Sequence, residues 1–146
     1  MAEPGILRVQ VVSPEKILYE GDGEMVICRT ADGDIAFLPQ HAPFLGALGV
    51  AKVRVILPTS VGHPDGEQVI AVHAGFVEVS NDRVIVLSDV AELPEQIDVA
   101  RAEAAKARAE AAVGADEHNA EAAAALERAV LRLDVAGAAP APTVTH

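Results

Sequence analysis

The sequence changes character abruptly at residues 92–95, Glu-Leu-Pro-Glu, and this change limits the chain to folds built of two different parts. Before it, short runs rich in valine and isoleucine are separated by Gly, Pro, Asp and Ser. After it, alanine makes up half of residues 100–129. Valine and isoleucine favour strands, whereas alanine is the strongest helix former. The sequence therefore predicts an α+β chain, with a β domain followed by a helical domain.

Residues 1–91 are predicted to form an antiparallel β-sandwich or barrel. Ile6–Val12 alternates apolar and polar residues and stops at a Ser-Pro pair, as a half-buried strand does. The other expected strands are Lys16–Tyr19, Glu24–Thr30, Ile35–Leu38, Val50–Leu57, Val69–Val72, Phe76–Val79 and Val84–Leu87. Turn residues recur between these runs without an intervening helical pattern, which favours an antiparallel architecture over a βαβ sheet. Pro58–Gln68 is expected to be an exposed loop.

Residues 92–136 are predicted to form an antiparallel hairpin of two helices, at about Gln96–Val113 and Ala120–Val135. In the second helix, Leu126, Ala129, Val130 and Leu133 are expected to form one apolar stripe. Alanine buries little apolar area, so such a hairpin is marginally stable alone and needs support from the sandwich, a partner or a ligand. Residues 137–146, rich in Ala and Pro, are expected to be a disordered tail.

Charge and hydropathy exclude several classes of protein. The net charge is −11, with acidic residues spread along the chain, which disfavours binding to nucleic acids and anionic lipid surfaces. No apolar stretch approaches the roughly 20 residues that span a bilayer, so direct membrane insertion is not expected. Nothing in the first residues indicates a secretory signal, and a soluble cytoplasmic protein is expected. Cys28 is the only cysteine and is expected to be a small buried side chain.

The sequence predicts neither an enzyme active site nor a metal centre. The five histidines, His41, His63, His73, His118 and His146, are not at metal-ligand spacing. No glycine-rich phosphate loop and no nucleophile-base-acid motif is present, so no required cofactor is expected. His73 lies inside an apolar run and is interpreted as a core histidine.

Arginines are the informative charges of the predicted hairpin. Arg101 and Arg108 are seven residues apart on the first helix, and Arg128 and Arg132 are four apart on the second, so each pair shares a helix face. An antiparallel hairpin can bring the two pairs together. Two interpretations remain open at this point, an ordinary solvated helix surface and an anion-binding site.

Three stretches carry a family resemblance. Residues 33–45 read Gly-Asp-Ile-Ala-Phe-Leu-Pro-Gln-His-Ala-Pro-Phe-Leu, residues 74–79 read Ala-Gly-Phe-Val-Glu-Val, and residues 97–102 read Ile-Asp-Val-Ala-Arg-Ala. In this order, and over about residues 6–136, they resemble the epsilon subunits of bacterial F-type ATP synthases. Gln40 and Ala74 stand where that family usually has glycine.

The resemblance implies a non-catalytic rotor subunit that couples the catalytic head to the c-ring. The β domain would contact the gamma subunit and the c-ring, with Asp34 and His41 at the contact. The hairpin would either fold onto the β domain or extend into the catalytic alpha/beta head, where it restrains ATP hydrolysis. The protein would be peripheral, on the cytoplasmic face of the membrane.

The resemblance also implies ATP as a regulatory ligand of the folded-down hairpin. The residues that it assigns to this site are Glu92, Ile97, Asp98, Arg101, Ala102, Arg108, Arg128 and Arg132. The alternatives are a nucleotide-sensing regulator that acts alone and a β-sandwich adaptor outside the synthase.

Overall fold

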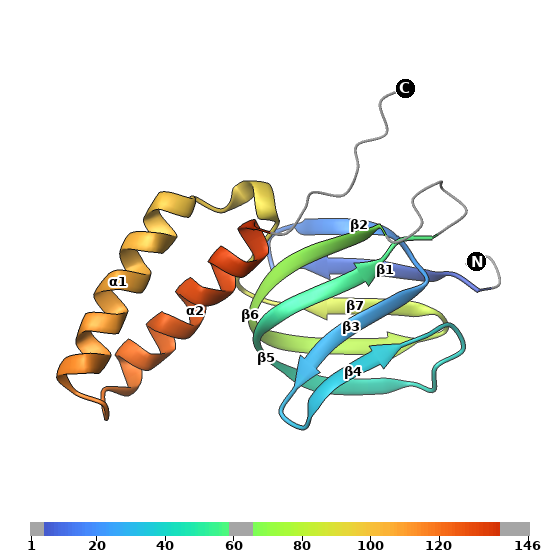
Figure 1. Cartoon of the computed structure of the whole chain (residues 1–146). Helices are drawn as coiled ribbons and strands as arrows, with labels where there is room; N and C mark the ends of the chain where they lie inside the picture. Colours follow the sequence, from blue (N-terminus) through green and yellow to red (C-terminus); the bar gives the residue numbers. More distant parts are fainter. Residues whose placement is uncertain (1–4, 59–65, 138–146) are drawn as a thin grey trace.

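A β-sandwich with a helical hairpin against one side makes up the fold (Figure 1). The computed structural model describes residues 5–58 and 66–137. Its strands are β1 (Leu7–Val12), β2 (Ile17–Gly23), β3 (Met25–Thr30), β4 (Gly33–Phe37), β5 (Phe44–Ile56), β6 (Glu67–Ser80), β7 (Arg83–Leu87) and β8 (Ala91–Glu92). A short 3-10 turn, η2 (Pro94–Gln96), leads to helices α1 (Val99–Ala115) and α2 (Ala120–Ala136). The predicted fold class is confirmed, while most of the predicted 58–68 loop and nearly all of the predicted tail lie outside the described residues.

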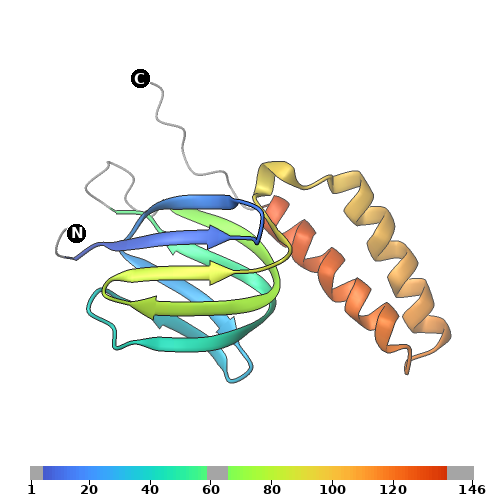
Figure 2. The same cartoon turned by 180° about the vertical axis from the view of Figure 1, so that it is seen from behind.

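The strands form one hydrogen-bonded path in the order β2-β1-β7-β6-β5-β3-β4, and β8 pairs with β6. This path folds over on itself to give the two layers seen from opposite sides in Figures 1 and 2. All the pairings are antiparallel except that of β1 with β7, which is parallel. The purely antiparallel sheet expected from the sequence is therefore wrong for this one pair.

Two long strands carry the fold from one layer to the other. The sequence predicts strands at Val50–Leu57, Val69–Val72 and Phe76–Val79, but β5 begins at Phe44, and β6 runs unbroken from Glu67 to Ser80. β6 passes through Ala74 and Gly75 with φ of 66° and 149°. A Cβ at Gly75 would lie 2.1 Å from the carbonyl oxygen of Leu87, so only glycine fits.

The left-handed backbone at Gln40 is stabilised by a hydrogen bond to a side chain from another turn. Gln40 has a φ of 69°, in the region that favours glycine, and glycine is the residue that the family pattern carries here. Its backbone N–H donates a 2.6 Å hydrogen bond to the Asp82 carboxylate. This contact stabilises a turn geometry that glutamine alone disfavours.

β6 is buried on both faces, and each face belongs to a different hydrophobic core. Ile70 and Val72 point into the sandwich core. Val69 and Ala71, on the opposite face, join Ile97, Leu131 and Val135 in a second cluster, here called the docking cluster. The docking cluster is where the hairpin meets the sandwich. Cys28 lies in the sandwich core as predicted, and burial raises the pKa of its thiol to about 12.

α1 starts later than the sequence predicts, because a 3-10 turn and a capping residue precede it. Pro94–Gln96 is a 3-10 turn rather than the first turn of the helix. Asp98 then caps α1, its carboxylate accepting a 3.0 Å hydrogen bond from the Arg101 N–H. Asn119 caps α2 in the same way through the Ala122 N–H. No helix of the described ranges is long and apolar enough to cross a membrane.

α2 has two buried faces, and the predicted single stripe is only partly right. Alanines at heptad spacing are buried along the hairpin: Ala102, Ala109, Ala122 and Ala129. A second face of α2 buries Leu131 and Val135 on β6, whereas Val130, expected in the stripe, is 46% exposed. In both views α2 lies between α1 and the sandwich (Figures 1 and 2).

We predict that the chain ending after Leu93 folds without the hairpin. Every fully buried residue of the sandwich core precedes Ala91, and Ala91 and Leu93 only cover its edge. Losing the hairpin exposes Val69, Ala71 and the neighbouring His73, none of which belongs to the sandwich core. Far-UV circular dichroism should show a cooperative β-type thermal transition, at a lower temperature than in the full chain. An unfolded or non-cooperative product would show that the sandwich requires the hairpin.

Candidate functional site

A cavity of about 320 Å³ lies where the hairpin joins the sandwich. β8 contributes Glu92, and the following turn contributes Gln96 and Asp98. The remaining lining residues come from the two helices: Arg101, Ala102, Ala105, Arg108 and Arg132. This volume is at the lower end of the range for small-molecule sites. The two helices and the linker therefore build the site together, and it exists as a unit only while the hairpin is docked.

The cavity contains positive charge that the described part of the chain does not neutralise. Three guanidinium groups line it, against the two carboxylates of Glu92 and Asp98. Arg132 donates from Nε to Glu92 Oε1 at 2.8 Å. Arg101 and Arg108 make no ion pair with any residue in the described ranges. Since the whole chain carries a net charge of −11, two unpaired arginines facing one cavity are suited to an anionic ligand.

The structure gathers most of the predicted site residues and gives several of them packing roles as well. Ile97 is buried in the docking cluster, Ala102 in the helix–helix seam, and Asp98 caps α1. Arg128 does not line the cavity, so the two arginine pairs do not meet as complete pairs. Whether these residues bind ATP stays a prediction.

Glu92 joins the hairpin to the sheet through a contact that sequence reasoning missed. Its Oε1 accepts the Arg132 hydrogen bond and lies 2.9 Å from His73 Nε2 on β6. The pairing of β8 with β6 places Ala71 opposite Glu92 and thereby brings the side chains of His73 and Glu92 together. No local motif signals this contact, because residues 73 and 92 become neighbours only through strand pairing.

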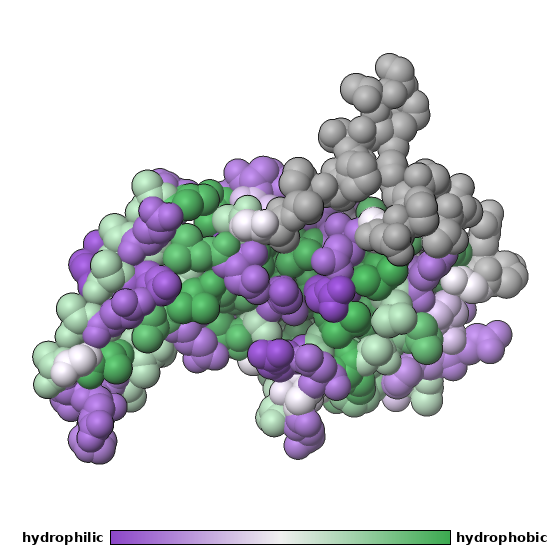
Figure 3. Space-filling view, in the orientation of Figure 1, coloured by the Kyte–Doolittle hydropathy of each residue, from purple (hydrophilic) through white to green (hydrophobic). Residues whose placement is uncertain are grey.

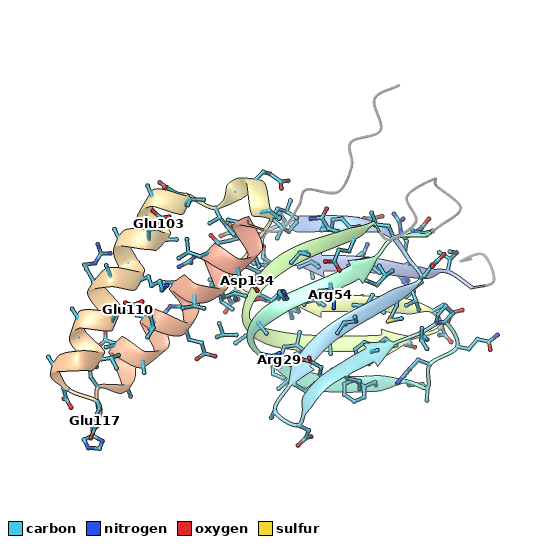
Figure 4. The ribbon with its side chains drawn as sticks, in the orientation of Figure 1. Arg29, Arg54, Glu103, Glu110, Glu117 and Asp134 are labelled. Atoms are coloured by element: carbon cyan, nitrogen blue, oxygen red, sulfur yellow. The ribbon has the colours of Figure 1, made fainter. Side chains whose placement is uncertain are left out.

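A second groove, of about 410 Å³, separates α2 from the sheet. Figure 4 shows Asp134 of α2 facing this side of the sandwich, from which Arg29 and Arg54 project. Here the cations are paired: Arg29 with Asp34 at 2.9 Å, Lys52 with Asp134 at 3.2 Å, and Arg54 with Glu67 at 2.8 Å. Hydrophilic side chains therefore collect at this junction in Figure 3. Because these charges are satisfied internally, the cavity with free arginines is the better ligand site.

The two residues predicted to contact other subunits lie apart. Asp34 is the second residue of β4 and lines the second groove, where its ion pair with Arg29 lowers the pKa of its carboxyl. His41 follows the other end of β4 and packs edge-on against Phe37, with ring centroids 5.1 Å apart. The structure therefore does not place Asp34 and His41 in one contact surface.

An exposed apolar patch lies on the outer face of β5, β6 and β7. Leu45, Phe76 and Leu87 are 72%, 55% and 45% exposed. Phe76 lies directly opposite Leu87 in the sheet. Leu45 lies opposite Glu78, which is two residues after Phe76 on β6 and therefore on the same face. Strand alternation from Phe44 onward indicates this surface, but residues 44–49 were not predicted to be a strand. Exposed apolar side chains grouped in this way indicate a protein contact.

The fold and the site define a class of two-part protein, in which a helical hairpin rests on a β-sandwich through the docking cluster. Comparisons with known proteins specify the class further. Residues 6–94 match the family model "ATP synthase, Delta/Epsilon chain, beta-sandwich domain". Residues 95–137 match "ATP synthase, Delta/Epsilon chain, long alpha-helix domain". The chain therefore belongs to the ATP synthase delta/epsilon family, as an epsilon subunit of the F-type enzyme.

Curated relatives match along most of the chain. The ATP synthase epsilon chain of Shouchella clausii is 42% identical over 132 residues, covering 89% of this chain and 94% of the relative. That of Halalkalibacterium halodurans is 43% identical over 135 residues, covering 90% and 97%. A chain in the Euglena gracilis mitochondrial ATP synthase shares the fold, with a TM-score of 0.74 at 17% identity over 93% of this chain and 84% of that one. Family membership favours the synthase interpretation over the two alternatives outside it.

We predict that Leu131→Ala weakens hairpin docking and that Val130→Ala does not. Leu131 is 7% exposed in the docking cluster, whereas its neighbour Val130 is 46% exposed. A buried Leu→Ala change typically costs about 2–5 kcal/mol, which is large beside a contact of five residues. Amide hydrogen exchange in α2 should become faster in Leu131→Ala only. Equal protection in both variants would contradict docking through this cluster.

Proposed function

We propose that this protein is a non-catalytic central-stalk subunit that couples the catalytic head to the c-ring and restrains ATP hydrolysis through its hairpin. It would act at the cytoplasmic face of the membrane as a peripheral component of the complex. The observation that carries the regulatory part is the cavity that spans both helices and the linker, in which Arg101 and Arg108 have no ion-pair partner among the described residues. A ligand there would add to the contacts that hold the hairpin on the sandwich, which are the docking cluster and the ion pairs of Arg132 with Glu92 and of Lys52 with Asp134.

ATP fits the chemistry of this cavity. It carries close to four negative charges, and an acidic protein must neutralise them locally in order to bind it. Arg101, Arg108 and Arg132 supply planar donor groups suited to phosphate oxygens. Glu92 and Gln96 supply polar groups for the remainder of the nucleotide, and Ala102 and Ala105 border it with apolar surface. Ile97 is buried in the docking cluster and does not line the cavity. Arg128 lies one turn before Arg132 and would join this set only after a change of side-chain conformation.

We further propose that the sandwich contacts the gamma subunit and the c-ring. The exposed patch of Leu45, Phe76 and Leu87 supplies apolar side chains of the kind found at the centre of subunit contacts. His41 lies in the loop that leads into β5, close in sequence to Leu45, and so belongs with this surface. Asp34, at the far end of β4, would need a separate contact. In its extended form, the hairpin would reach the alpha/beta head.

We predict that Arg101→Ala lowers ATP affinity about tenfold or more. A charge-assisted hydrogen bond contributes roughly 1.5–3 kcal/mol, and Arg101 has no competing partner in the described ranges. Lys106→Ala is the matched control, because Lys106 lies on the same helix but pairs with Glu110 and does not line the cavity. Isothermal titration calorimetry of the full chain with ATP, ADP and GTP measures both variants. No heat at millimolar ATP in the unmodified chain would refute the site.

We predict that a chain lacking residues 94–146 raises ATP hydrolysis by the reassembled catalytic head while still joining the complex. The sandwich core and the apolar patch remain intact in this chain, whereas the element proposed to enter the head is gone. Steady-state ATPase activity at several ATP concentrations, with gamma capture as the assembly control, tests this expectation. Unchanged hydrolysis alongside normal assembly would argue against a regulatory hairpin.

A further inference from the structure

The imidazole of His73 is enclosed between the sheet and the hairpin. On β6 it continues the face of Val69 and Ala71, so it lies at the border of the docking cluster. Its side chain is only 4% exposed. Nε2 lies 2.9 Å from Glu92 Oε1, and Nδ1 is buried without a hydrogen-bond partner among the described residues. A carboxylate only accepts hydrogen bonds, so Nε2 carries the proton and Nδ1 holds a bare lone pair.

The charged groups around His73 come from two elements. β8 contributes Glu92, whose Oε1 His73 shares with Arg132. α2 contributes Arg132 itself and Arg128, both of which act electrostatically on the imidazole. β5 places the uncharged Val50 opposite His73. Docking the hairpin therefore adds two positive charges near His73 and removes water from it.

We propose that His73 is a proton-sensitive latch, which holds the hairpin on the sandwich while its imidazole is neutral and releases the hairpin when it is protonated. The neutral ring donates one hydrogen bond to Glu92 and thereby keeps that carboxylate in place for Arg132. A second proton would sit on Nδ1, where the described residues offer no acceptor. It would also add a buried positive charge beside two guanidinium groups.

The electrostatics of the docked state agree with this geometry. Burial is the largest cause that lowers the pKa of His73, and Arg132 and Arg128 lower it further, while the hydrogen bond to Glu92 acts in the opposite direction. Undocking removes both arginines and exposes the ring to water, while the β8–β6 pairing keeps Glu92 beside it. The pKa of His73 is therefore higher in the undocked state than in the docked state.

The sign of the pH effect follows from this difference. The state with the higher pKa binds the proton more readily, so acid favours the undocked hairpin. Docking should be independent of pH above the pKa that His73 has in the undocked state, where Glu92 still lies beside the ring. Below that value the docking equilibrium should weaken, by at most about tenfold per pH unit for one proton, until the docked pKa is reached. This effect needs no nucleotide.

The test measures docking and protonation in the same nucleotide-free full chain. Methyl NMR signals of Val69, Leu131 and Val135 report the docked population between pH 8 and 5.5, a range that leaves most carboxylates ionised. We expect this population to fall with acidification in the unmodified chain. His73→Gln, whose amide still donates to Glu92 but does not titrate, should stay docked throughout. His118→Gln is the matched control, because His118 lies at the hairpin turn with its side chain 89% exposed, and it should behave as the unmodified chain.

Two results would overturn the latch. One is a docked population in the unmodified chain that does not change between pH 8 and 5.5. The other is an equal response to acid in His73→Gln. If His73→Gln does not fold, the ring carbon signals of His73 in the unmodified chain decide the matter. A pKa below the ordinary value while the hairpin is docked supports the latch, and an ordinary or raised pKa overturns it.

Discussion

Burial of one strand on both faces is the constraint on which this structure depends. Between Val69 and Val72, β6 gives alternate side chains to the sandwich core and to the docking cluster. The same strand holds β5 and β7 on its edges, and it holds β8, which carries Glu92 to the base of the hairpin. The position of the helices, and with it the cavity at their base, therefore follows from the placement of β6.

The sequence contains a signal for this double burial that the predicted strands did not take into account. Val69, Ile70, Ala71 and Val72 form an unbroken apolar run, and a half-buried strand would alternate instead. The change of composition at Glu92 correctly separated sheet from helices. The segment from Phe44 to Gly49 escaped recognition because Gly46 and Gly49 weaken strand propensity, and pairing with β6 overrides that weakness. The two strands predicted at Val69–Val72 and Phe76–Val79 are similarly one strand, because Gly75 lets the backbone bend and continue.

For the site, helix spacing predicts only which residues share one face of a helix. Spacing along α1 correctly placed Arg101 and Arg108 on one face, and both line the cavity. It could not separate Arg132 from Arg128, because that choice depends on how far α2 is rotated when Leu131 and Val135 dock. His73 was interpreted as an ordinary core histidine because the strand around it is apolar. Its Nδ1, which has no partner among the described residues, and its contact with Glu92 arise from strand pairing and docking, which local patterns do not encode.

A small docking cluster makes the hairpin responsive to modest free energies. Each tenfold change in a two-state equilibrium corresponds to about 1.4 kcal/mol, which is the scale of one hydrogen bond or one proton. Under the proposals made above, a bound polyanion and a proton act on the same Arg132–Glu92–His73 contact with opposite signs. The anion offsets the guanidinium charge, whereas the proton adds to it. An anion bound near Arg132 would thus reduce the electrostatic penalty of protonating His73 in the docked state. Because linkage is reciprocal, ATP would lessen the release of the hairpin by acid, and acid would weaken ATP binding mainly by emptying the docked state rather than by altering the phosphate contacts.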